Sequence, residues 1–546
     1  MESFSLHQSH GSFQEVISPI TVLKRHASIL VTLLFFYAVI IILLSISLKM
    51  SGGNLSYSLD DTFIHMAIAK HLVVNGVWGV TPYEFSSSSS SPLYTLLLAA
   101  SFYCFGPNML APLILNILLS TFLLFLIEDL LVKQNLSFGE KVLSLMAFVF
   151  FMPLPILTVM GMEHVLHTLM SIWFAYLATK ILSKETVDRT SYIKLLLVAI
   201  LLTSSRYEGL FIIIPVCVLF FFRKKFLTGL LLGFAAILPL MIYGIISLKA
   251  GSYWLPNSVL LKGQEVSFLS FDGIRNLYER PLLILSQAPW LFSISIFVFT
   301  LGVIRHYALK LSIWNTGQLM ILIFLTAVLF HLEFARVGWA YRYEAYLMAL
   351  GILVLAMHSK ETLAVIYERL NLQQRLVAGS LIMIMTIPIA ARGAVSLIKS
   401  PVASKNIYEQ QFQMGRFLKI HYNRQSVLAA DIGAINFLAD LACLDFIGLG
   451  SIEIAKARRE GRFDQAFVKN IVDQKGIRIA VVYDYEFIQN QSGWKKVAEW
   501  KISDNKVAAS DNVSFYAIHE NEVEPLLSNL RSFERELPPT VKVSYY

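Results

Sequence analysis

Long apolar runs constrain the fold of this chain more than any other feature of its sequence. The first run covers residues 28–48, and about 20 such residues are enough to cross the hydrocarbon core of a bilayer as a helix. Hydrophobic residues make up 56% of the chain, charged residues make up only 15%, and the mean hydropathy is +0.62. A soluble protein needs more charge on its surface, so lipid is the expected solvent for most of this chain.

Basic residues between the apolar runs predict how the chain crosses the membrane. Lys24 and Arg25 precede the first run, and the positive-inside rule therefore places the N-terminus in the cytoplasm. That run is longer than the apolar core of a signal peptide, so we expect no cleavage there. Following the same rule along the chain gives about eleven spans and an external C-terminus. The predicted spans cover residues 28–48, 108–131, 141–160, 165–182, 193–203, 210–222, 227–248, 290–304, 320–332, 346–357 and 376–391.

Two long segments between the spans are predicted to be external loops. They cover residues 49–91 and residues 249–287. The apolar stretch at residues 92–105 directly follows the first loop and is too short to cross a bilayer comfortably. We therefore expect residues 92–105 to form a helix in the outer interface of the membrane.

The end of the chain, residues 400–546, has a different character. It is polar and mixed in charge, and it contains no apolar run long enough to span a bilayer. Short apolar segments at residues 426–430 and 477–483 end in turn-forming or acidic residues, which is typical of buried parallel strands between helices. The predicted fold class is a polytopic α-helical membrane protein, residues 1–399, with a C-terminal soluble α/β domain outside the cytoplasm, residues 400–546.

Composition and motifs also exclude several classes of function. The net charge of +8 is typical of the cytoplasmic loops of a membrane protein and does not indicate nucleic-acid binding. Three scattered cysteines are too few for a disulfide framework or a metal cluster. The sequence shows no phosphate-binding P-loop, no zinc-protease HExxH and no serine-hydrolase GxSxG motif, so nucleotide hydrolysis and protease chemistry have little support.

Two adjacent acids, Asp60 and Asp61, begin a predicted helix in the first external loop, where the helix dipole stabilises negative charge. Paired carboxylates at a membrane surface suit a proton acceptor with a supporting partner, or a divalent-cation site. The alternative is a helix cap and a first-turn acid on an amphipathic surface helix, whose residues Phe63, Ile64, Ile68 and Leu72 can lie against the bilayer. Spacing alone favours this alternative.

Further charged residues lie at the predicted outer ends of other spans. Glu163, Arg206 and Glu208 either cap helices there or line one charged external cavity. Lys262 in the second loop, and Arg336 and Arg342 before a late span, have the chemistry to bind a phosphate. The aromatic residues near Asn257 are typical of an interface belt.

The order of these motifs along the chain is more specific than any single one. Asp60 and Asp61 are followed by Ser90 to Ala99, by Gly161 to Glu163, by Thr203 to Gly209, by Leu255 to Ser258 with Lys262, by Tyr341 to Tyr343, and by Asp431 to Ile435 with Asp445 to Leu449. This ordered set resembles the GT-C superfamily of membrane glycosyltransferases, which use polyprenyl-phosphate-linked sugars. The closest likeness is to the bacterial branch that contains mycobacterial arabinofuranosyltransferases with a soluble C-terminal domain. The chain departs from the family pattern at Ala67, at Tyr207 and in the serine run at residues 86–91.

The resemblance implies transfer of a sugar, arabinofuranose or another pentose or hexose, from a polyprenyl phosphate to an envelope glycan, a lipid-linked glycan or a protein. It implies inversion at the anomeric carbon, and it places the reaction at the outer face of a bacterial inner membrane. Asp60 would be the general base, and Asp61 would orient the acceptor or, with Asp60, hold Mg²⁺, Mn²⁺ or Ca²⁺. The residues implied in substrate binding are His65, Glu163, Arg206, Glu208, Asn257, Lys262 and Arg342.

Two other classes of function remain open at this point. A transporter or flippase of lipid-linked sugars would place ionisable groups near the middle of the bilayer and would show paired half-repeats. The acids of this chain cluster at predicted outer helix ends instead, and no repeat of fixed period is visible. The third class is an envelope scaffold without catalysis, in which the charges only cap helices.

Overall fold

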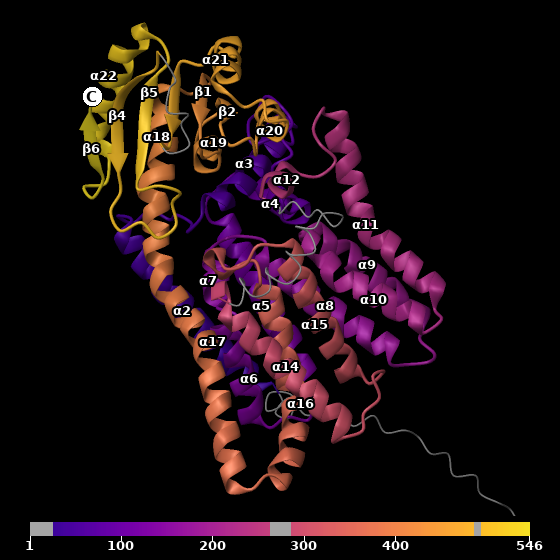
Figure 1. The fold of residues 1–546 in the computed structure, drawn as a ribbon. Helices are drawn as coiled ribbons and strands as arrows, with labels where there is room; N and C mark the ends of the chain where they lie inside the picture. The colour runs from indigo at the N-terminus through magenta and orange to yellow at the C-terminus, as the bar shows by residue number, and fades with distance from the viewer. Residues whose placement is uncertain (1–25, 263–285, 485–492) are drawn as a thin grey trace, which may run out of the picture.

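The computed structural model of the protein describes residues 26–262, 286–484 and 493–546. It consists of a bundle of long helices with a sheet domain on one end (Figure 1). Lys24 and Arg25, which predict the orientation of the N-terminus, and most of the predicted second loop lie outside the described residues. The predicted class, a polytopic helical membrane protein with a C-terminal α/β domain, is confirmed.

Each of the eleven predicted spans falls on helices of the bundle, with residues 141–160 divided between α6 and α7 at Pro153. Within the described residues, eight helices are long and apolar enough to cross a membrane. The helices α6, α9 and α10 are shorter, so the count of about eleven spans stays a prediction. The bundle helices are α2 (Ala27–Met50), α5 (Ala111–Val132), α6 (Phe138–Phe151), α7 (Leu154–Val159), α8 (His164–Leu182), α9 (Arg189–Ser205), α10 (Leu210–Phe222), α11 (Phe226–Lys249), α14 (Pro289–Tyr307), α15 (Thr316–Phe334), α16 (Ala345–Arg369) and α17 (Leu372–Ile407).

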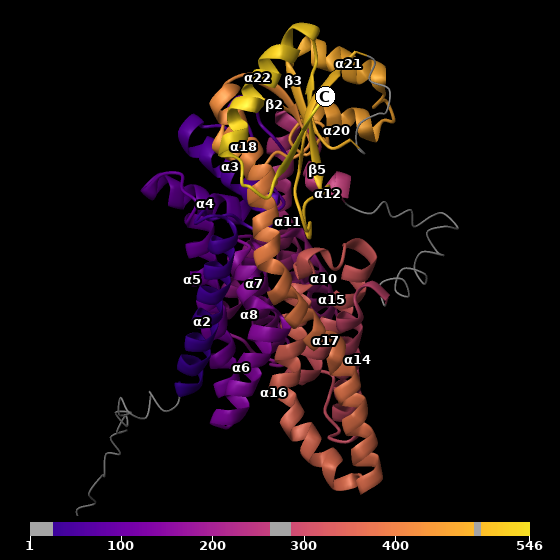
Figure 2. The same cartoon turned by 90° about the vertical axis from the view of Figure 1, so that its left-hand side faces the viewer.

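Three shorter helices lie between the bundle and the sheet domain (Figures 1 and 2). They are α3 (Asp60–Asn75), α4 (Pro92–Phe105) and α12 (Asn257–Lys262). The helix expected at residues 92–105 is therefore present. It begins where the Ser91 side chain accepts a hydrogen bond from the Tyr94 amide, and it ends before Gly106, which has a positive φ.

The prediction that α3 lies with Phe63 and Ile64 against the bilayer is wrong. Phe63 is fully buried and packs against Phe437 and Phe412 of the C-terminal region. Ile64 belongs to the hydrophobic core of the sheet domain. The helix α3 lies between the helical bundle and the sheet domain, which cover these apolar side chains. Their burial against protein replaces the expected burial in lipid.

The C-terminal domain contains a six-stranded sheet in the order β2-β1-β3-β5-β4-β6. The two strands predicted at residues 426–430 and 477–483 are β1 and β3, and they pair in parallel as expected. The other half of the sheet is antiparallel, which the sequence analysis did not predict. The strands are β1 (Ser426–Ala429), β2 (Ala442–Asp445), β3 (Ile479–Val482), β4 (Lys495–Lys501), β5 (Asn512–Ala517) and β6 (Lys542–Tyr545).

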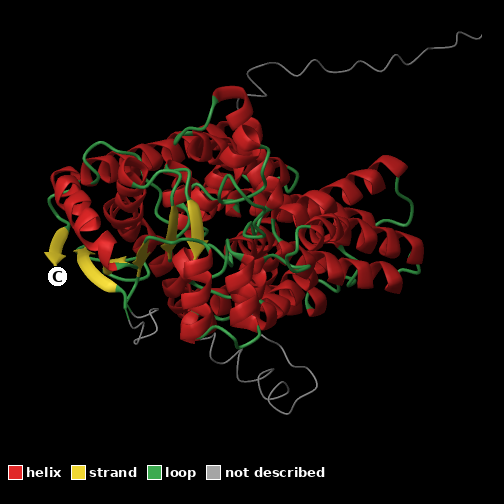
Figure 3. Cartoon of the chain, turned by 90° about the horizontal axis from the view of Figure 1, so that it is seen from above, coloured by secondary structure: helices red, strands yellow, loops and turns green. Residues whose placement is uncertain are grey.

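Helices pack around the sheet, as the view from above shows (Figure 3). They are α18 (Gln413–His421), α19 (Ala434–Leu438), α20 (Ile452–Arg459), α21 (Gln465–Gln474) and α22 (Val523–Phe533). The bundle joins this domain through α17, which continues through residue 400 without a break and leads by one turn of π-helix into α18 (Figure 2). The predicted boundary between residues 399 and 400 therefore lies inside a continuous helix.

Candidate active site

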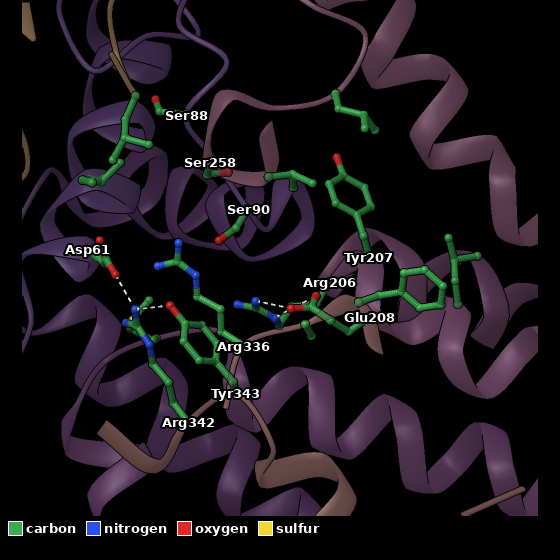
Figure 4. Close-up of a pocket in the computed structure, with 18 of the residues that line it drawn as sticks. Asp61, Ser88, Ser90, Arg206, Tyr207, Glu208, Ser258, Arg336, Arg342 and Tyr343 are labelled. Atoms are coloured by element: carbon green, nitrogen blue, oxygen red, sulfur yellow. Dashed lines mark hydrogen bonds and ion pairs between the residues drawn. The ribbon is translucent and has the colours of Figure 1, made fainter. Parts of the chain in front are cut away.

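The segments predicted to be external meet at the end of the bundle that carries the sheet domain. They enclose a cavity of about 370 Å³ between the bundle, α3, α12 and the sheet domain (Figure 4). Its charged lining comes from α3, from the turn between α9 and α10, and from the loop between α15 and α16. The charged and imidazole side chains that line it are Asp61, His65, Arg206, Glu208, Arg336 and Arg342.

The cavity is lined by apolar as well as charged side chains. Phe211 of α10, Leu240 of α11 and Phe334 of α15 line it together with the charged residues. These three helices belong to the bundle, and each also has large apolar side chains exposed on its outer surface. The cavity therefore offers both charged and apolar side chains to one ligand, and Figure 4 labels the polar ones.

Asp61 and Arg342 form an ion pair in the cavity wall. The Arg342 Nη2 donates to Asp61 Oδ2 at 2.6 Å and to the Tyr343 hydroxyl at 3.1 Å. The Arg342 side chain is 3% exposed and that of Asp61 is 25% exposed. The guanidinium is thus fixed in the wall, while the carboxylate retains a face toward the cavity.

A second group of charges surrounds Arg206. This residue is extended between α9 and the short 3₁₀ helix Tyr207–Gly209, and the break in the helix turns Arg206 and Glu208 toward each other. Arg206 Nη2 donates to Glu208 Oε1 at 2.5 Å, and Nη1 donates to Glu163 Oε1. Glu163 is fully buried, and His65 Nε2 lies 3.4 Å from its Oε2. The sequence-predicted residues Glu163, Arg206, Glu208 and His65 are therefore neighbours in space.

Asp60 points away from this cavity, although it is the neighbour of Asp61 in sequence. Its Oδ2 accepts a hydrogen bond from the amide of Gly433 and its Oδ1 accepts one from the amide of Ala434, both at 2.8 Å. A Cβ at position 433 would lie 2.2 Å from the backbone oxygen of Asp60 and 2.6 Å from its Oδ2, so only glycine permits this approach. Burial, together with the nearby Asp431 carboxylate, raises the pKa of Asp60 to about 8.

The two residues predicted in the second loop take different places. Asn257 does not line the cavity: its side-chain amide donates to the backbone oxygens of Gly448 and Leu449, each at 3.3 Å, and holds α12 against the sheet domain. The helix α12 ends at Lys262, whose side chain lies outside the described part of the structure.

The geometry does not fit a metal ion shared by Asp60 and Asp61. Both oxygens of Asp60 accept backbone amide hydrogens, and Asp61 is neutralised by Arg342. In the part of the chain that the structure describes, no group of three or more His, Cys, Asp or Glu side chains is arranged to hold a metal ion.

Arg336 is a cavity residue that the sequence analysis considered only as one of several phosphate-binding candidates. Its side chain is exposed and points into the cavity (Figure 4). No other described residue hydrogen-bonds or ion-pairs with its guanidinium, whereas Arg206 and Arg342 are both paired with carboxylates. Tyr343 was not singled out from the sequence as a separate site residue, yet its ring stacks within 5.7 Å of Arg206 and 4.9 Å of Arg342.

Comparison with known proteins gives limited likenesses. Residues 405–516 match a domain of unknown function, DUF8728. None of the curated proteins matches the chain.

Two of the similar solved structures cover most of the chain. ArnT from Cupriavidus metallidurans bound to undecaprenyl phosphate is 13% identical, with a TM-score of 0.49, and the match covers 89% of this chain and 98% of that one. The Archaeoglobus fulgidus oligosaccharyltransferase in the apo form is 10% identical, with a TM-score of 0.44, over 87% of this chain and 74% of that one. At these identities the likeness concerns the fold alone.

Proposed function

We propose that the protein is a membrane glycosyltransferase that takes its sugar from a polyprenyl phosphate. The observation that carries this proposal is the cavity with charged and apolar regions at the domain end of the bundle. An isoprenoid chain would lie against Phe211, Leu240 and Phe334, and its phosphate would lie beside the arginines of the same cavity.

Arg336 and Arg342 are the phosphate-binding residues of this proposal. The guanidinium of Arg336 has no ion-pair partner among the described residues, so it is available to a ligand anion. Arg342 is fixed by Asp61 and Tyr343 and can approach the same phosphate. Fixed cationic donors at a leaving phosphate stabilise the negative charge that develops as the bond to the sugar breaks.

Asp61 is the general base of the proposed reaction. It would accept the proton of the acceptor hydroxyl, whose oxygen attacks the anomeric carbon while the lipid phosphate leaves, with inversion. The family resemblance implied Asp60 for this role. Geometry comes before pKa in choosing a base, and Asp61 lines the cavity, whereas both oxygens of Asp60 are occupied by the amides of Gly433 and Ala434. Asp60 is the alternative base, and transfer by the variants Asp60→Asn and Asp61→Asn distinguishes the two.

The remaining parts of the proposal follow the family resemblance. The sugar is a pentose such as arabinofuranose or a hexose, and the acceptor is an envelope glycan, a lipid-linked glycan or a protein. The membrane is the bacterial inner membrane, with the N-terminus in the cytoplasm and the sheet domain outside. Loops that were predicted to be external meet at one cavity, which supports placing them in a single compartment.

The test is transfer by the purified protein in proteoliposomes. Undecaprenyl phosphate carrying a labelled sugar is supplied with glycan extracted from the envelope, and products are identified by mass spectrometry. We expect a glycosidic product that Asp61→Asn abolishes. Movement of labelled lipid between leaflets without any product would support the transporter instead, and comparison of envelope glycans from cells with and without the gene would identify the acceptor.

A further inference from the structure

The serine run at residues 86–91 divides its side chains between the protein interior and the cavity. In an extended chain, successive side chains point to opposite sides. Ser87, Ser89 and Ser91 are each less than 2% exposed and contact the protein, whereas Ser88 and Ser90 line the cavity. A sequence of identical residues thus has two sets of roles.

The odd-numbered serines support the fold around the cavity. The hydroxyl of Ser87 contacts the hydroxyls of Tyr243 and Ser247 on α11 at 3.5 and 3.1 Å. Ser89 Oγ lies 3.0 Å from the hydroxyl of Thr95, and Ser91 caps the start of α4. Replacing these serines would disturb packing without changing the cavity wall.

The even-numbered serines present hydroxyl groups to the cavity. Ser90 Oγ donates to Glu163 Oε1 at 3.2 Å, which leaves both acceptor lone pairs of its hydroxyl for another partner. Ser88 Oγ lies 2.9 Å from Ser86 Oγ and also retains hydrogen-bonding capacity. Figure 4 shows both side chains among the residues that line the cavity.

Two further hydroxyls line the same cavity, and these have no hydrogen-bond partner among the described residues. They are the Oγ of Ser258 on α12 and the phenolic oxygen of Tyr207, and both atoms are inaccessible to solvent. Buried polar atoms in native proteins are nearly always hydrogen-bonded, and leaving one unpaired is costly. A ligand with hydroxyl groups would satisfy both.

We propose that Ser88, Ser90, Ser258 and Tyr207 form the sugar-recognition site of the donor, specific for an uncharged sugar ring with free hydroxyls. The inference rests on the proposed function and adds the class of sugar to it. Each carboxylate at these hydroxyls or in the cavity wall already has an arginine partner, Arg206 for Glu163 and Glu208 and Arg342 for Asp61, so none is left unpaired for a cationic sugar. Hydroxyl groups accept from and donate to sugar hydroxyls alike, which suits a polyol.

The test compares binding of two kinds of lipid to the protein in nanodiscs. One probe is bare undecaprenyl phosphate, and the others carry glucose, mannose or arabinose on the same phosphate. We expect the wild type to prefer at least one sugar-bearing lipid. In the double variant Ser88→Ala/Ser90→Ala, the ratio of affinities for sugar-bearing and bare lipid should fall about tenfold, because two hydrogen bonds to the sugar are lost. The affinity for the bare lipid should not change.

The matched control is Ser87→Ala, which removes a neighbouring hydroxyl that faces α11. It should lower the melting temperature and leave the lipid preference unchanged. If the double variant keeps the wild-type preference, or loses affinity for both kinds of lipid equally, the sugar-recognition site is overturned and the proposed function stands. A wild-type protein that binds none of the lipids would overturn both proposals.

Discussion

Replacement of Asp61 by Asn is the most direct test of the proposed chemistry. The change keeps the size of the side chain and removes the basic oxygen that faces the cavity. General-base catalysis by a positioned carboxylate contributes about 100- to 10,000-fold in rate, which corresponds to about 3 to 5 kcal/mol of transition-state stabilisation. We expect kcat to fall by this factor, with donor binding retained or strengthened, because Arg342 loses the carboxylate that neutralises it.

Asp60→Asn is the matched control for this experiment. The side-chain amide that it introduces would keep one acceptor oxygen for the backbone amides of Gly433 and Ala434 and would lose the other, at a cost of about 1 kcal/mol of stability. We expect transfer by this variant to stay within about tenfold of the wild type.

The assay is single-turnover transfer at saturating donor, with the melting temperature of each variant measured in the same detergent. Loss of transfer in Asp60→Asn, at unchanged melting temperature and with activity retained in Asp61→Asn, would refute the assignment and make Asp60 the base.

Three further predictions concern the phosphate and the contact between the sheet domain and α3. Arg336→Ala should raise the KM for donor about tenfold or more, because the loss of one charge-assisted hydrogen bond costs that much binding, and it should change kcat little. Replacement of the exposed Arg462 by Ala should change neither constant. Because the pKa of Asp60 is raised to about 8, the folded state retains a proton that the unfolded chain releases at about pH 4, and stability should fall as the pH rises through this window. Melting curves between about pH 5 and 9 should show this slope, reduced in Asp60→Asn, and an equal slope in both proteins would contradict it. Gly433→Ala should destabilise the protein by about 1 to 3 kcal/mol in thermal or denaturant unfolding, because the new methyl group would lie 2.2 Å from the backbone oxygen of Asp60. Gly139→Ala, where the new methyl group meets open space, is the control.

The sequence was sufficient for features that depend on local physics. Each predicted span falls on helices because a chain in lipid must satisfy its backbone hydrogen bonds within the segment, which leaves the apolar run as a direct signal. The bounds of α4 agree with the prediction because Ser91, Pro92 and Gly106 are local start and stop signals. The parallel strands β1 and β3 were recognisable because each is a short apolar run bounded by turn-forming or acidic residues, which is also a local signal.

Features that depend on what a side chain faces, whether lipid, protein or cavity, required the tertiary structure. The apolar residues of α3 could have faced lipid or protein, and only the position of the sheet domain shows that they face protein. The serine run was visible as low complexity, but the alternate roles of Ser88 and Ser87 depend on α11 and the cavity. In the sequence, Arg336 is one of several candidate phosphate-binding residues. Only the structure shows that Arg206 and Arg342 are paired with carboxylates, which distinguishes Arg336 from them.

The two acids at the start of α3 show this division most clearly. The sequence alone indicated that a carboxylate pair begins a helix in the first loop, and the resemblance made this pair the centre of the chemistry. Neighbouring residues on a helix point about 100° apart, and in this structure Asp61 lines the cavity whereas Asp60 contacts the sheet domain. Which of them does so depends on where the amides of Gly433 and Ala434, more than 370 residues later, are placed by the sheet domain.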